Sequence, residues 1–158
     1  GYTAEYWGLG INKGYIERYR DLIVQKIVEE NKKDVVLIGW SVGGVIAREV
    51  ARTLPDNINS VFTFGAPIKG PQYTVGYDVY SQEEIDRLFK LRLELDETNP
   101  INVPITAIFS KNDKVVSWPS CLDEVSPNVR HFQVSSPHLS MVLDPDVWYL
   151  LAKHLEGN

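Results

Sequence analysis

A glycine-rich turn between an apolar run and an amphipathic pattern constrains this chain more than any other feature. Residues 35–38 are typical of a strand buried on both faces, and residues 45–54 have helical spacing. Between them stands Gly39-Trp40-Ser41-Val42-Gly43-Gly44, which contains Gly-x-Ser-x-Gly. The glycines at 39 and 43 remove side chains that would collide in so tight a turn, and the serine is forced into a strained conformation. The pattern predicts a nucleophile elbow. The alternative, without a catalytic role, is a flexible Gly/Ser turn.

The elbow predicts where two kinds of polar group lie. The hydroxyl of Ser41 stands at the carboxyl edge of a sheet. The first free N–H groups of the following helix, with that of Val42 among them, point toward negative charge that develops beside it.

Strand and helix patterns alternate along the rest of the chain. Apolar runs predict strands at 2–7, 58–64, 103–109 and 128–134, and amphipathic patterns predict helices at 12–30, 81–95 and 145–155. Helix ends are marked by Asn31 as a C-terminal cap, by the capping box of Ser81 and Glu84, and by Asp144 before Pro145. This alternation predicts an α/β fold with a mostly parallel sheet and flanking helices, in a single domain over residues 1–158.

Residues 68–102 interrupt the alternation. An irregular stretch containing Tyr73, Tyr77 and Tyr80 precedes the helix that the capping box begins. Two interpretations stay open: a lid or cap that covers a pocket, or an ordinary crossover helix with a long loop.

Two further residues follow predicted strands and complete a catalytic set with Ser41. Asp113 comes after the strand at 103–109, and His138 comes after the strand at 128–134. Turns after parallel strands open on one edge, so the three side chains are expected to meet there. A serine needs a base to take its proton, and the base needs a third group to orient it. The chain order Ser, Asp, His is the one associated with nucleophile elbows.

Each member of this set has rivals. Asp113 stands in an Asn-Asp turn, where aspartate is common for local reasons, but Asp96, Glu97, Asp123 and Glu124 are less well placed. His131 falls in the last strand, and His154 falls at the edge of a helix's apolar face, which favours a structural role.

Composition excludes several other classes of protein. Hydrophobic residues make up 44% of the 158 and charged residues 23%, which is typical of a globular chain. The net charge of −5 argues against a nucleic-acid partner, and no apolar run is long enough to span a membrane. Three scattered histidines and the lone Cys121 predict neither a metal site nor an internal disulfide. No cofactor is expected, and the compartment is open, with the cytoplasm favoured.

The elbow hexapeptide, Phe64-Gly65-Ala66-Pro67, residues 110–116 and Ser136-Pro137-His138-Leu139 resemble the α/β-hydrolase superfamily. The chain is most similar to bacterial lipase- or esterase-like members, from Trp7-Gly8-Leu9-Gly10 to the last helix. The resemblance implies Ser41 as nucleophile, Asp113 as acid, His138 as base and the Val42 N–H in the oxyanion hole. Trp40 is a candidate for lining an acyl pocket, and Leu9 is a further substrate-binding candidate.

The sequence differs from the family pattern in its N-terminal part. Family members have three strands before the equivalent of residues 2–7, and the loop after the third supplies a second oxyanion N–H; the fold is therefore expected to be N-terminally truncated or minimal. In one explanation residues 2–7 pair with residues 35–38, and Gly8-Leu9-Gly10 supplies the missing donor. In a second, another copy or chain completes the open edge. In a third, the sequence is a fragment with impaired activity.

The expected function is hydrolysis of small-molecule carboxylic esters through an acyl-enzyme on Ser41. An acyltransferase or thioesterase with the same triad remains an alternative, as does a non-catalytic binding or assembly module of the same fold.

Overall fold

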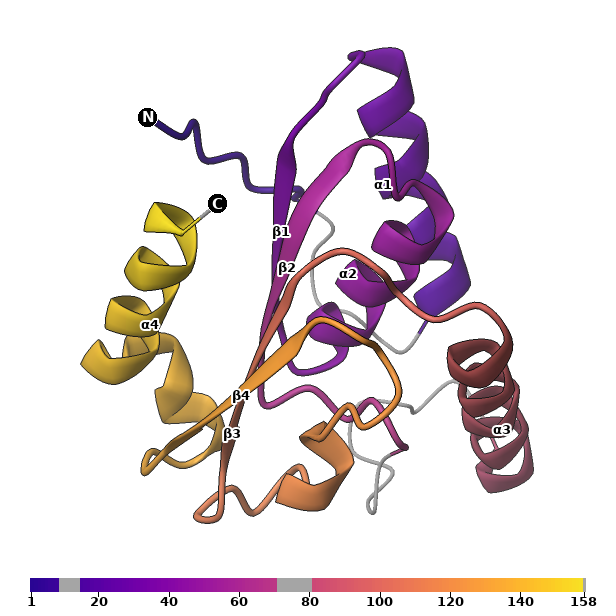
Figure 1. Ribbon diagram of the computed structural model, residues 1–158. Helices are drawn as coiled ribbons and strands as arrows, with labels where there is room; N and C mark the ends of the chain where they lie inside the picture. Colours follow the sequence, from indigo (N-terminus) through magenta and orange to yellow (C-terminus); the bar gives the residue numbers. More distant parts are fainter. Residues whose placement is uncertain (9–14, 71–80, 158) are drawn as a thin grey trace.

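Four parallel strands form the centre of the computed structural model, which describes residues 1–8, 15–70 and 81–157 (Figure 1). The strands are β1 (Val35–Trp40), β2 (Ile58–Phe64), β3 (Ile105–Ser110) and β4 (Val129–Val134), and they lie in the order β1-β2-β3-β4. Every neighbouring pair is parallel. The predicted α/β fold with a parallel sheet is therefore confirmed.

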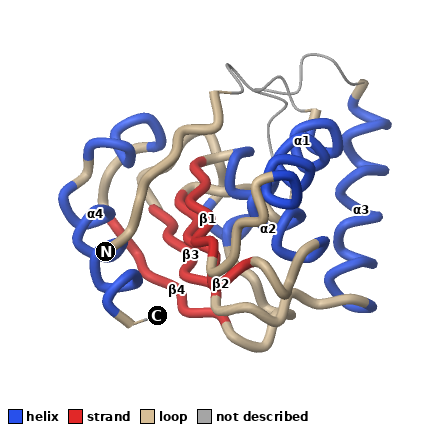
Figure 2. The backbone as a smooth tube through the Cα atoms, turned by 90° about the horizontal axis from the view of Figure 1, so that it is seen from above, coloured by secondary structure: helices blue, strands red, loops and turns tan. Residues whose placement is uncertain are grey.

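Helices cover both faces of this sheet. α1 (Ile16–Glu29), α2 (Val42–Thr53) and α3 (Gln82–Thr98) lie on one side, and α4 (Pro145–Glu156) lies on the other (Figures 1 and 2). Successive strand residues point to opposite faces. Val61 and Ile105 accordingly pack with the α1 and α2 core, whereas Phe62 and Ile108 pack with the α4 core. Two short 3₁₀ helices, η1 (Trp118–Cys121) and η2 (His138–Leu143), follow β3 and β4.

The three predicted helix caps are present. Asn31 has a positive φ of 47° after α1, where the Asn31 N–H donates to Val28 and the Lys32 N–H to Ile27, as in a Schellman motif. Ser81 and Glu84 form the capping box of α3. Asp144 accepts a hydrogen bond from the Asp146 N–H at the start of α4. These ends were predictable because each depends on side chains within a few residues.

The predicted strand at residues 2–7 is wrong. These residues run from α4 to α1: the Tyr2 hydroxyl donates to the Leu155 carbonyl, Glu5 pairs with Lys32 at 2.5 Å, and the Lys26 ammonium lies over the Trp7 ring. A strand needs a neighbour to satisfy its backbone, and aromatic composition alone does not supply one. The first explanation for the missing family strands, in which residues 2–7 pair with β1, is therefore wrong.

β1 is the outer strand of the described sheet, and among the described residues it pairs only with β2. A groove of about 710 Å³ runs along its free edge, between residues 1–8 and side chains of α1 and α2. Ile38 is 50% exposed there, so the expectation that this strand is buried on both faces is wrong. A second chain that completes this edge remains a prediction.

α3 is attached to α2 through buried charges. Arg48 contacts Asp96 at 3.2 Å and Asp123 at 2.5 Å, and Arg52 also pairs with Asp96. Burial by itself would raise the pKa of Asp123, but the Arg48 guanidinium and hydrogen bonds from Ser126 and the Val125 N–H outweigh burial and lower that pKa to about 2. The predicted lid segment therefore includes a helix fixed to the body by ion pairs. Tyr73, Tyr77 and Tyr80 lie outside the described residues, and the lid role stays a prediction.

Candidate active site

The predicted nucleophile elbow joins the carboxyl end of β1 to the first turn of α2. Ser41 is the N-cap of α2 and has φ 54° and ψ −131°, a combination that costs a residue with a side chain about 1–3 kcal/mol. Its N–H donates to the Phe64 carbonyl of β2 at 3.0 Å. The predicted strain at the serine is confirmed, and it keeps the hydroxyl outside the helix, where it makes no capping bond.

The glycines of the elbow have different roles from those expected. A Cβ at Gly39 would lie 2.4 Å from the Gly43 carbonyl oxygen, and a Cβ at Gly44 would lie 2.6 Å from the Cβ of Ala66. Apart from its chain neighbours and the backbone of its own helix, no described atom lies within 4 Å of a Cβ built at Gly43. The tight positions are therefore 39 and 44, because Gly44 is the residue that faces β2 and the turn after it.

The three predicted catalytic residues lie together at the carboxyl end of the sheet. The Nε2 atom of His138 is 3.0 Å from the Ser41 hydroxyl oxygen, and its Nδ1 atom is 2.6 Å from a carboxylate oxygen of Asp113. Ser41 follows β1, Asp113 follows β3 and His138 follows β4. The geometry is a continuous chain of hydrogen-bonding groups from a buried carboxylate to a partly exposed hydroxyl.

Asp113 is held rigidly behind the imidazole. Its second carboxylate oxygen accepts hydrogen bonds from the Val115 and Val116 N–H groups, both at 2.8 Å. The local turn that makes aspartate common in loops thus aims the other oxygen at His138.

The Asp113 carboxylate also affects a neighbouring thiol. Burial and this nearby carboxylate raise the pKa of the Cys121 thiol to about 12.

The rival acids and histidines lie elsewhere. Asp96 and Asp123 pair with Arg48, and Glu124 pairs with Lys69. His131 accepts a hydrogen bond from the Asp123 N–H, and His154 lies between the hydroxyls of Ser60 and Thr106. None of these five side chains has a described contact with Ser41.

The remaining site predictions have mixed outcomes. Val42 is the first residue of α2, so its N–H is one of those that a helix leaves without an internal acceptor. Trp40 packs its ring against the imidazole of His138. Leu9 lies outside the described residues.

Gly65 lies at the site, although the sequence predicts no role for it beyond its place in the Phe64-Gly65-Ala66-Pro67 motif. It has φ +59°, and a Cβ there would lie 3.1 Å from Nδ1 of His138 and 3.2 Å from the Met141 sulfur. A side chain here would press on the imidazole and would have to adopt a positive φ, so glycine suits this position. One sequence signal could have pointed to Gly65: it directly follows the predicted strand at 58–64, which comes next in the chain after the elbow strand and its helix.

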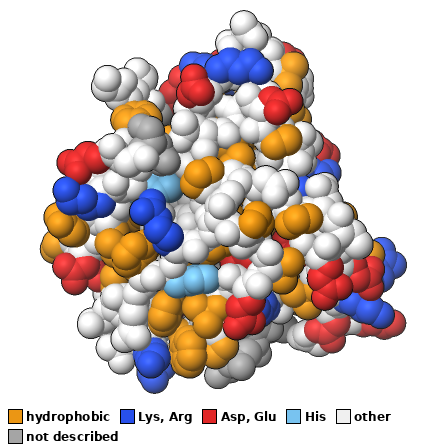
Figure 3. Space-filling view, in the orientation of Figure 1, with side chains coloured by type: hydrophobic (Ala, Val, Ile, Leu, Met, Phe, Trp, Pro, Cys, Tyr) orange, Lys and Arg blue, Asp and Glu red, His pale blue; other side chains and the backbone are white. Residues whose placement is uncertain are grey.

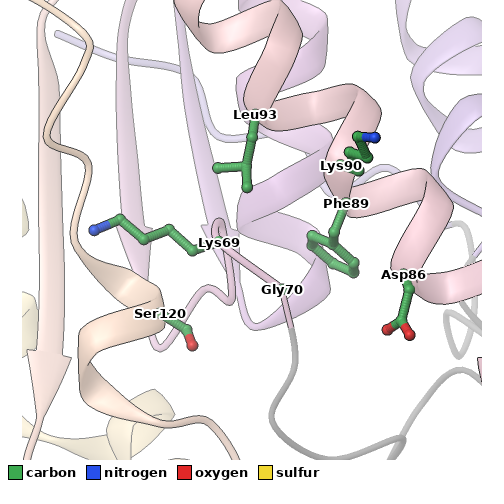
Figure 4. Close-up of a pocket in the computed structure, with 7 residues that line it drawn as sticks. All are labelled: Lys69, Gly70, Asp86, Phe89, Lys90, Leu93 and Ser120. Carbon is green, nitrogen blue, oxygen red and sulfur yellow. The ribbon is translucent and has the colours of Figure 1, made fainter.

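A cleft of about 360 Å³ lies between α3, the loop after β2 and η1. It is lined by Lys69, Gly70, Asp86, Phe89, Lys90, Leu93 and Ser120 (Figure 4). Phe89 and Leu93 point from α3 toward the loop after β2 and toward η1. No member of the Ser41, His138 and Asp113 set lines this cleft.

Two kinds of site are not found in the part of the chain that is described. No group of three or more histidine, cysteine, aspartate or glutamate side chains there is placed to hold a metal ion. No described helix combines the length and apolar character that a membrane crossing requires.

Several solved structures share this fold at low sequence identity. A hydrolase from Oleispira antarctica has a TM-score of 0.66 and 16% identity over 93% of this chain and 74% of its own. A meta-cleavage product hydrolase from Pseudomonas fluorescens has a TM-score of 0.63 and 15% identity over 100% of this chain and 77% of its own. The type II thioesterase BorB, from the borrelidin biosynthetic cluster, has a TM-score of 0.63 and 18% identity over 89% of this chain and 70% of its own.

Sequence comparison identifies the family. No curated protein gives a significant match to the sequence. The family model described as "PGAP1-like alpha/beta domain" matches residues 12–148, which is most of the chain. The chain therefore belongs to the PGAP1-like alpha/beta domain family, within the α/β-hydrolase superfamily.

Proposed function

We propose that this protein is a serine hydrolase of carboxylic esters. The observation that carries the proposal is the hydrogen-bonding sequence Asp113–His138–Ser41, with distances of 2.6 Å and 3.0 Å. Hydrogen bonds of this length position a base for a serine proton and a carboxylate for the base. The fold shared with hydrolases supports the same chemistry.

The reaction begins with attack by the Ser41 oxygen on the ester carbonyl carbon. His138 Nε2 takes the serine proton, and Asp113 holds the imidazole in the tautomer that leaves Nε2 free to accept it. His138 then returns the proton to the departing alcohol, which leaves an acyl group on Ser41. A water molecule, deprotonated by His138, attacks this acyl-enzyme and releases the acid.

Negative charge develops on the carbonyl oxygen in both steps. The Val42 N–H, at the positive end of α2, is the donor that we assign to that oxygen. One donor of this kind is worth about 3–4 kcal/mol in the transition state. The other predicted donor loop, Gly8-Leu9-Gly10, lies largely outside the described residues.

Exposed hydrophobic side chains on η2 and near the carboxyl ends of β3 and β4 support an apolar acyl or alcohol group. Leu139, which follows His138 directly, is 69% exposed, and Leu143 at the other end of η2 is 82% exposed. Hydrophobic side chains also form a patch over the lower part of the view in Figure 3, where Figure 1 shows β3, β4 and η1 ending. Exposed apolar patches mark sites where apolar groups bind.

Chromogenic p-nitrophenyl esters of increasing acyl length test the proposal. We expect wild-type protein to release p-nitrophenol and to carry the acyl group on the peptide that contains Ser41 after an acid quench. The Ser41→Ala variant should retain its fold by circular dichroism and lose both signals. Release without a Ser41 adduct, or equal release by the variant, would contradict the proposal.

Acceptor competition separates hydrolysis from its alternatives. The fold shared with the thioesterase BorB supports inclusion of acyl thioesters among the substrates. Faster turnover of a thioester than of the matched oxygen ester would identify a thioesterase. Acyl transfer to an added alcohol in preference to water would identify an acyltransferase, and absence of any acyl adduct would favour a non-catalytic module.

A further inference from the structure

Trp40 contacts His138 in two ways at once. Its indole Nε1–H donates a hydrogen bond to the His138 carbonyl oxygen at 3.2 Å. Its ring also packs on the imidazole, with centroids 5.1 Å apart and planes inclined by 35°. One side chain, adjacent to Ser41 in the chain, therefore restrains both the backbone and the ring of His138.

The two hydrogen bonds of the His138 ring leave one movement of the ring that they do not themselves restrain. Bonds to Asp113 and Ser41 fix the two ring nitrogens, but a ring held only at these atoms can still tilt about the line through them. His138 is also the first residue of η2, and the N-cap of η2, Pro137, makes no side-chain capping bond. Packing against the indole limits the tilt, and the Nε1–H bond limits movement of this end of η2.

We propose that Trp40 is a positioning residue, which holds His138 in line between Asp113 and Ser41, rather than a wall of the acyl pocket. This proposal rests on the proposed esterase function. It assigns Trp40 an effect on the rate of the chemical steps and little effect on substrate affinity. A displacement of about 1 Å at a catalytic group can lower a rate by about 100-fold.

Trp148 offers a matched control. Its indole Nε1–H donates to the Val142 carbonyl oxygen at 3.0 Å, near the other end of η2, and its side chain is half exposed. Trp40→Phe and Trp148→Phe therefore each remove an indole hydrogen bond to a carbonyl of η2. Only the first removes a bond to His138.

The test is the steady-state kinetics of these variants with one p-nitrophenyl ester, together with their thermal unfolding. We expect Trp40→Phe to lower kcat about tenfold, the equivalent of one neutral hydrogen bond of somewhat above 1 kcal/mol, with KM changed less than about twofold. Trp40→Leu, which also removes the ring, should lower kcat about 100-fold. Trp148→Phe should leave both constants within about twofold of wild type.

Three results would overturn the proposal. A raised KM at unchanged kcat in Trp40→Phe would make Trp40 part of the substrate pocket. An equal fall of kcat in Trp148→Phe, with equal loss of thermal stability, would reduce the effect to the stability of η2. An unchanged kcat in both Trp40 variants would remove any role in positioning.

Failure of the proposed esterase function can be distinguished from failure of the proposed positioning role of Trp40. If folded wild-type protein turns over no ester, the NMR resonance of the His138 Nδ1–H proton that faces Asp113 still reports the position of the ring. Positioning by Trp40 predicts that this resonance shifts or broadens in Trp40→Leu and stays in Trp148→Phe. An unchanged resonance in both variants would overturn the inference.

Discussion

Two buried histidines, His138 in η2 and His154 in α4, each contact a serine hydroxyl. The two contacts lie at different places along the strands of the sheet. His138 contacts Ser41 and Asp113 beyond the carboxyl ends of the strands. His154, on α4, contacts Ser60 of β2 and Thr106 of β3, each at 2.8 Å. The serine–histidine distances are nearly the same, so the contact alone does not identify a catalytic site.

The differences lie in the third partner and in the setting of the serine. Asp113 can stabilise a charged imidazolium, whereas the Thr106 hydroxyl is neutral. Ser41 is partly exposed at the start of α2, while Ser60 is fully buried within a strand. Burial, reinforced by Arg130, lowers the pKa of His154. The first arrangement suits proton transfer, and the second suits neutral hydrogen bonding between α4 and the sheet.

The largest expected difference comes from removing each serine hydroxyl. Ser41→Ala should lower kcat about 10⁵–10⁶-fold, because the nucleophile is lost. Ser60→Ala should leave kcat within about twofold and lower the free energy of unfolding by about 1 kcal/mol, because one buried hydrogen bond is lost. Ester hydrolysis and urea unfolding measure the two effects. Similar activities in the two variants would remove the distinction between the sites.

Changing the third partner should give the next largest difference. Asp113→Asn should lower kcat about 10⁴-fold, because the amide favours the wrong imidazole tautomer. Thr106→Val keeps the side-chain shape, removes the hydroxyl beside His154 and should leave kcat unchanged. A pH–rate series for both variants checks this prediction. An Asp113→Asn enzyme within about tenfold of wild type would contradict the role of the carboxylate.

Adding a methyl group to each of two glycines that have a positive φ compares the site with the rest of the fold. Gly65→Ala should lower kcat about 10–100-fold, since its Cβ would press on His138 at 3.1 Å. Gly70→Ala is the control: Gly70 also has a positive φ, of +106°, but its Cβ would meet Phe89 instead. The control should lose thermal stability and keep its kcat. Equal kcat values in the two variants would contradict the steric argument.

The smallest expected effect is the pH dependence of stability that His154 causes. Its pKa is lowered in the folded protein, so below about pH 6.5 the unfolded chain binds a proton that the folded chain does not. Stability should therefore fall as the pH drops through this range. Urea unfolding between about pH 7.5 and about pH 5.5 should show a steeper fall in wild type than in His154→Gln. An equal fall in both proteins would contradict the prediction.

The comparison also shows which parts of the molecule the sequence could predict. Ser41, Asp113 and His138 were predictable because each follows a strand, and parallel strands end at one edge. Asn31, Ser81 and Asp144 were predictable because caps are local.

Other features depend on contacts between distant parts of the chain. Residues 2–7 look like a strand but form none, since β-propensity cannot say whether a partner strand is present. The tight packing of Gly44 and Gly65 depends on Ala66 and His138, and the Ser60–His154–Thr106 contact depends on how α4 docks. Local patterns carry no information on such contacts.

Labelling with a fluorophosphonate probe, followed by peptide mapping, tests most directly whether Ser41 alone is an activated nucleophile. The probe reacts with a serine whose hydroxyl a neighbouring base activates. We expect an adduct on the peptide that contains Ser41, none on the peptide that contains Ser60, and no adduct in folded Ser41→Ala. Folded wild-type protein that stays unlabelled, or labelling that persists in Ser41→Ala, would contradict the account.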